Sequence, residues 1–352
     1  MRWGLAILFL AACGDDGGSS AIDAATPIDM GVSIDAPVDA NPNMPSTLAD
    51  TGLCTNAACT TYAADVRVYA PQYELWSDGA TKKRWIYLPP GTKIDTTDMN
   101  YWKFPVGTKL WKEFTRGGVR VETRFMLKVM ENDATPGAWF FASYVWNTAQ
   151  NATTEATPGG MQDANGTQHD IPMRAQCRRC HDNTPGRVLG VQALSLDFQG
   201  ATGELDLDDL AAMNLLTTNP PGTAGAPRFP LPVNNGNGAV DKAAYGYMHG
   251  NCGGCHNPNS SIFATTTLDL RMDVTKLSSV TVMPARVTTV NVNGTVGGLT
   301  GPIVKPNDTA NSVLITRMNI AAGTNGRMPE IGTEITDPAG LAALTAWINQ
   351  PP

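Results

Sequence analysis

The chain has 352 residues, enough for two or three domains with a sizeable core. A hydrophobic content of 42% is ordinary for a soluble protein, and 35 Gly with 25 Pro indicate many turns and short elements. The net charge of −7 comes from the first 50 residues, which hold one Arg and seven acids, because the remainder balances 24 bases against 25 acids. A nearly neutral body gives no indication of a nucleic-acid partner.

The N-terminus has the pattern of an export signal. Arg2 precedes an apolar run over residues 3–12 that is too short to span a bilayer. The run ends in Leu-Ala-Ala-Cys at Cys13, which resembles a bacterial lipoprotein cleavage box. We therefore expect a signal peptide at 1–12 and a lipid on Cys13, which would anchor the protein to a membrane of the cell envelope. Ordinary cleavage beside an incidental Cys is the alternative.

Residues 13–46 form a low-complexity segment of Asp, Ala, Pro, Gly and Ser. Such a composition cannot bury enough apolar surface to fold. We expect a disordered acidic tether that supplies reach alone.

Residues 47–148 have the pattern of a β-rich module, with six of the eight Trp of the chain. Apolar and charged residues alternate over 119–129, which predicts a half-buried antiparallel strand. Further strands, bounded by Gly and Pro turns, are expected at 84–88, 101–104, 109–114 and 139–146. We predict an antiparallel β-sandwich-like module.

Two features of this module bear on function. Cys54 and Cys59 stand at its start, and two Cys in an oxidising compartment with no other role predict a disulfide. Between residues 67 and 128 there are twelve Lys or Arg against six acids. These charges could dock an acidic redox partner, but a solvated strand face is the more common explanation.

Two copies of Cys-x-x-Cys-His carry the chemistry of the second half. The thiols in each copy lie one helical turn apart, so they can add to the two vinyl groups of one porphyrin, and the His becomes the proximal iron ligand. A zinc half-site or a redox pair is the alternative for one isolated copy. The attachment residues are Cys177, Cys180, Cys252 and Cys255, and the proximal ligands are His181 and His256.

The rest of the chain predicts a mostly α-helical dihaem region. We expect a linker at 149–170, a first haem region at 171–238 and a cytochrome c-like domain with the second haem at 239–352. Helices are predicted at 205–216, 239–249 and 311–319, with a last helix capped by Asp337, and an extended segment at 268–272. The fold class is therefore α+β multidomain, with the β-module first and the haem region second.

The order of elements after residue 239 resembles the small class I cytochrome c fold. The resemblance implies that Met328, on a Met-Pro loop between two helices, is the distal ligand opposite His256. The first haem has no such loop. Its sixth ligand could be His169, His249 or Met213, although Met213 also fits the apolar stripe of its helix, or the position could be open.

Residues 73–80, 84–91 and 104–109 resemble the N-terminal module of a family of exported bacterial dihaem c-type cytochromes. The match runs from about residue 47 to 348. It implies a β-rich module, two haem c groups and electron transfer to redox partner proteins.

Three functions follow from these features. The leading hypothesis is an electron carrier at the cell envelope that relays electrons between two haems and a partner. The second is a dihaem peroxidase-like enzyme with one open-coordinate haem. The third is a binding protein whose β-module recruits a protein or carbohydrate, with the haem domain attached.

Overall fold

The computed structural model describes residues 45–233, 237–294 and 299–350. These residues all belong to one compact unit. The signal peptide, Cys13 and all of the tether except residues 45 and 46 lie outside the described residues. No helix in the described ranges has the length and apolar character needed to cross a membrane.

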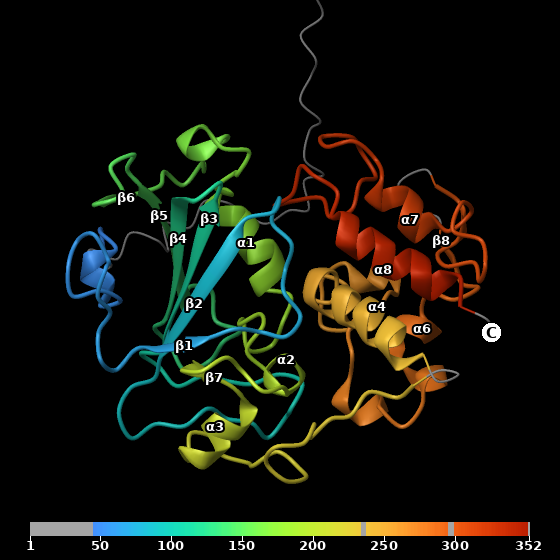
Figure 1. Cartoon of the computed structure of the whole chain (residues 1–352), viewed down its shortest axis with the longest axis horizontal. Coiled ribbons are helices and arrows are strands. Elements are labelled where there is room, and N and C mark those ends of the chain that lie inside the picture. The colour runs from blue at the N-terminus through green and yellow to red at the C-terminus, as the bar shows by residue number, and fades with distance from the viewer. Residues whose placement is uncertain (1–44, 234–236, 295–298, 351–352) are drawn as a thin grey trace, which may run out of the picture. The chain divides into compact units, whose positions relative to one another are not determined.

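The architecture is organised by one seven-stranded sheet with the order β6-β5-β4-β3-β2-β1-β7 (Figure 1). All its neighbours are antiparallel except β1 and β7, which are parallel. Its strands are β1 (Arg67–Tyr69), β2 (Thr81–Tyr87), β3 (Lys109–Arg116), β4 (Val119–Lys128), β5 (Trp139–Trp146), β6 (Thr153–Glu155) and β7 (Glu204–Leu205). A separate pair joins β8 (Asn293–Gly294) to β9 (Gly301–Pro302).

The predicted strands at 84–88, 109–114, 119–129 and 139–146 match β2 to β5, but the sandwich prediction was wrong. The strands form a single mixed sheet, and the N-terminal segment and α1 (Arg174–His181), not a second sheet, pack against it. Residues 101–104 are not a strand either. Only Lys103 pairs there, in an isolated bridge to Asp95, while Trp102 and Phe104 enter the core.

One face of the sheet is aromatic and is covered by the N-terminal segment. Leu48 and Leu53 pack on it, and the Trp111 indole Nε1 donates to Thr51 Oγ1 at 2.9 Å. The buried rings of this face are Trp85, Trp111, Phe125, Phe140, Tyr144 and Trp146. The segment thus seals an apolar surface that would otherwise face water.

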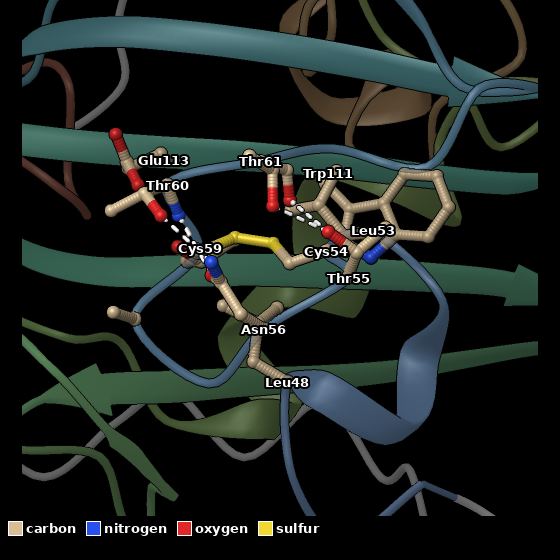
Figure 2. Close-up of a disulfide and its surroundings, with 12 residues drawn as sticks. Leu48, Leu53, Cys54, Thr55, Asn56, Cys59, Thr60, Thr61, Trp111 and Glu113 are labelled. Atoms are coloured by element: carbon tan, nitrogen blue, oxygen red, sulfur yellow. Dashed lines mark hydrogen bonds between the residues drawn. A yellow bond between two sulfur atoms is a disulfide. The ribbon is translucent and has the colours of Figure 1, made fainter.

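A disulfide between Cys54 and Cys59 closes a small loop in this covering segment, with the Cα atoms 5.0 Å apart. Figure 2 shows how the loop is braced, since the Asn56 side chain both donates to Thr60 Oγ1 at 2.8 Å and accepts from the Thr60 amide at 3.0 Å. The cross-link limits the freedom of the segment in the unfolded chain and so favours the covered sheet.

The prediction of a mostly α-helical haem region was also wrong, because the helices are short and joined by long loops. Among the described residues there are eight α-helices, and the longest has 14 residues. They are α1 (Arg174–His181), α2 (Ala193–Leu196), α3 (Leu207–Ala212), α4 (Gly238–Asn251), α5 (Phe263–Thr266), α6 (Pro284–Val287), α7 (Val313–Met318) and α8 (Pro338–Ile348). The 3-10 turns are η1 (Ala49–Thr51), η2 (Ala164–Gly166), η3 (Val274–Lys276) and η4 (Val280–Val282).

The helices α4 and α8 pack together at one side of the sheet (Figure 1). The rings of Tyr245 and Trp347 meet with centroids 5.4 Å apart. The predicted cap is present, since the Asp337 carboxylate accepts from the Ala339 amide at 3.0 Å. One hydrophobic cluster runs from Ile86 in the sheet to Leu344 in α8, so the two parts share a core.

Candidate haem-attachment site

The first Cys-x-x-Cys-His motif lies entirely within α1, which packs against the sheet at β5. The thiols of Cys177 and Cys180 are free and partly exposed. The His181 ring packs against Phe141 with centroids 5.2 Å apart. Its Nδ1 lies 2.6 Å from the Arg187 carbonyl oxygen, which can only accept, so Nδ1 carries the proton and the Nε2 lone pair is free. A metal-binding His needs this arrangement.

The second motif begins where α4 ends. Cys252 is the C-terminal cap of α4, and its carbonyl accepts from the amides of Cys255 at 3.0 Å and His256 at 2.8 Å. The Asn257 side chain closes the turn by donating to the Gly253 carbonyl at 2.9 Å. The turn therefore holds both thiols and the imidazole on one short segment.

Residues 73–76 fix the end of α4 on the sheet side. A Cβ at Gly250 would lie 2.7 Å from the Tyr73 carbonyl oxygen, so only Gly allows this approach. The Trp76 amide donates to the Asn251 side chain at 2.7 Å, and Asn251 donates back to the Glu74 carbonyl at 3.1 Å. No chemical role was predicted for this segment, and the structure shows that it positions the second motif.

The two motifs meet, although 75 residues separate them. Cys180 Sγ lies 3.6 Å from Cys255 Sγ. An ion pair of 2.6 Å between Arg179 and Glu330 ties the first motif to the loop that carries Met328. Four thiols could in principle hold one metal ion, but no cluster of three or more His, Cys, Asp or Glu suited to a metal occurs within the described residues.

The imidazoles of the two motifs are neutral at pH 7. Burial, and then the cations Lys112, Arg124 and Arg187, lower the pKa of His181 to about 4. Burial, and then Arg317, lower the pKa of His256 to about 4. Within the described chain, the buried Nδ1 of His256 has no hydrogen-bond partner. His256 therefore lacks the Nδ1 hydrogen bond that supports the ring of His181, and it matches the pattern of a metal-binding imidazole less well.

His249 is not available to iron in this arrangement. Its Nδ1 accepts from the Met272 amide at 3.1 Å, which places the proton on Nε2. The Gln192 side-chain amide lies 2.7 Å from Nε2 and accepts this proton when its oxygen is turned toward the ring. The ring is buried beside Tyr73. Both nitrogens of His249 are thus engaged in holding α4 against the core.

His169 keeps one nitrogen free. Its Nε2 lies 2.8 Å from the carboxylate of Glu122, which also accepts from Arg124 at 2.6 Å, and its Nδ1 makes no hydrogen bond within the described chain. The ring is buried against Phe114. The charges of Glu122 and Arg124 both act on Cys177, so this cluster lies close to the first motif. A carboxylate on one ring nitrogen is the usual support for a His whose other nitrogen binds metal.

The two Met candidates lie in different settings. Met213 is 47% exposed at the end of α3. It is therefore not the core residue that the apolar stripe of its helix indicates, and it is not enclosed in a haem site. The loop of Met328 lies beside the second motif. The Met328 amide donates to the Arg317 carbonyl at 3.0 Å, and the charges of Arg317 and Glu330 both act on His256.

The donor set fits two covalently attached haems. Each motif supplies two free thiols and one neutral imidazole. The two cavities that touch α1 measure about 20 and 10 Å³, so attachment requires α1 to move away from the sheet.

The charged side of the predicted half-buried strand does not face water. Arg84 and Glu122 are buried, and Lys112 and Arg124 are half-buried on the face of the sheet that turns to α1. The alternation over 119–129 predicts which residues share this face of the strand. It does not predict that other parts of the protein cover this face.

Comparisons with known proteins assign no family to the chain. No protein family model, curated protein or solved structure matches it. The likeness to the dihaem cytochrome family therefore stays an expectation from its sequence motifs.

Proposed function

We propose that the protein is an exported dihaem c-type cytochrome that transfers electrons at the cell envelope. The observation that carries the proposal is the contact between Cys180 and Cys255, with the sulfurs 3.6 Å apart. Haems attached to the two motifs would be neighbours, which suits a relay of electrons between them and on to a redox partner protein. The haem iron supplies the one-electron couple, and the chain sets access and potential.

The residues divide the work as follows. Cys177 and Cys180 hold the first haem and His181 ligates its iron, while Cys252, Cys255 and His256 do the same for the second. Met328 is the proposed sixth ligand of the second haem. His169 is the proposed sixth ligand of the first, because it keeps a free ring nitrogen and a carboxylate partner close to Cys177. A lipid on Cys13 would keep the protein at a membrane.

The haem content of the protein tests this proposal. The full chain, expressed in a host that matures c-type cytochromes, should carry two haems that resist extraction by acidified organic solvent. Intact mass and the pyridine haemochrome absorbance per chain measure the number. One haem or none would overturn the proposal.

A further inference from the structure

A row of three basic residues crosses the middle of the sheet. Arg84 on β2, Lys112 on β3 and Arg124 on β4 are direct cross-strand partners. Like charges in directly opposite positions destabilise a sheet. Such a row needs an anionic partner that offsets the repulsion.

The basic row faces the first haem motif. The charges of Lys112 and Arg124 both act on His181, and Arg124 also acts on Cys177 and Cys180. Phe141, on the same face of the neighbouring strand β5, packs against the His181 ring. A group that is attached to α1 and lies between this helix and the sheet would therefore lie over the basic row.

The chain itself balances only part of this charge. Arg84 pairs with Glu74 at 2.8 Å, and Arg124 pairs with Glu122 at 2.6 Å. Lys112 has no carboxylate within ion-pair distance in the described ranges, and its Nζ lies 4.9 Å from the centre of the Phe114 ring. Burial, and then its cationic neighbours, put the pKa of Lys112 well below its usual value. Lys112 is the uncompensated member of the row.

We propose that Lys112, together with Arg84 and Arg124, binds a carboxylate group. Charge-assisted bonds from Lys and Arg to carboxylate are among the strongest polar contacts in proteins. Within the proposed function, the propionates of the first haem are the carboxylate that the fold brings to this face. A free polycarboxylate offers the same chemistry, and the test below separates the two sources.

The first arm measures the two midpoint potentials of the full-length holoprotein by spectroelectrochemical titration. If the propionates fill the row, Lys112→Gln lowers one midpoint and leaves the other unchanged, because an uncompensated carboxylate near the iron favours the ferric state. Lys112→Arg keeps the charge and should restore the wild-type value. Lys83→Gln removes the same charge from an exposed position on the opposite face and should change neither midpoint.

The second arm measures the thermal midpoint of wild type and Lys112→Gln with increasing citrate. If a free carboxylate fills the row, citrate raises the wild-type midpoint to a plateau, and Lys112→Gln loses the response. If the propionates fill it, citrate acts equally on both proteins. Identical potentials and identical citrate responses in wild type and Lys112→Gln would overturn the proposal. A chain that carries no haem refutes the proposed function. The citrate dependence of its thermal midpoint still tests whether the row binds a carboxylate.

Discussion

Replacing Cys252 and Cys255 together with Ala is expected to halve the haem content and leave the first haem in place. Each motif carries its own two thiols and its own imidazole, so each attaches its haem independently. The pyridine haemochrome absorbance per chain should fall to about half, and the intact mass should fall by one haem. The replacement of Cys177 and Cys180 should give the same loss from the other site.

The disulfide provides the matched control for these thiol replacements. Cys54→Ser with Cys59→Ser also removes two thiols, but on the aromatic side of the sheet, and should keep both haems. Because Cys180 and Cys255 lie in contact, one shared site with four thiolates is the competing reading. Complete loss of the cofactor after the removal of either pair would identify that shared site.

Replacing Glu122 with Gln is expected to cost about 1–3 kcal/mol of unfolding free energy at pH 7, because it leaves the half-buried Arg124 without its charge partner. Arg124 and His169 hold the pKa of Glu122 at about 2 against the pull of burial, where the usual value is 4.5. Because the pKa of Glu122 is lower in the folded protein than in the unfolded chain, the ionised carboxylate stabilises the fold at pH values above 4.5. This contribution to the unfolding free energy is lost as the pH falls from 4.5 toward 2. The gap between wild type and variant in urea unfolding should therefore shrink across that range.

Glu113 is the matched control on the neighbouring strand. It is also buried, but burial raises its pKa, and its nearest cation, Arg120, is 3.8 Å away. Glu113→Gln should therefore change the unfolding free energy much less than Glu122→Gln at pH 7. An equal cost for the two variants would show that the pair of Glu122 and Arg124 has no special role.

Local features of the sequence predicted local structure. The alternation over 119–129 marked β4, and Asp337 followed by Pro marked the start of α8, because neighbouring residues decide strand periodicity and helix caps. The single sheet could not be read in this way. Its parallel edge pairs β1 with β7, which lies far along the chain, and such a pairing depends on the whole core.

In the candidate site, too, the local features could be predicted from the sequence and the non-local features could not. Cys-x-x-Cys-His is a local signature, so the attachment residues could be named from the sequence. Two features of the site depend on residues that are far apart in the sequence, and no motif spacing predicts them. They are the contact of Cys180 with Cys255 and the engagement of both His249 nitrogens. The basic row was hidden for a different reason, since charges on a strand usually face water and here a helix covers them.

The most direct test of the relay is a reduced-minus-oxidised spectrum of the mature protein, repeated under carbon monoxide. We expect the bands of two low-spin c-type haems per chain that carbon monoxide leaves unchanged, because Met328 and His169 close the sixth positions. A haem that binds carbon monoxide would contradict this ligation and favour an enzyme with an open iron. A spectrum without haem bands would contradict haem attachment at the two motifs.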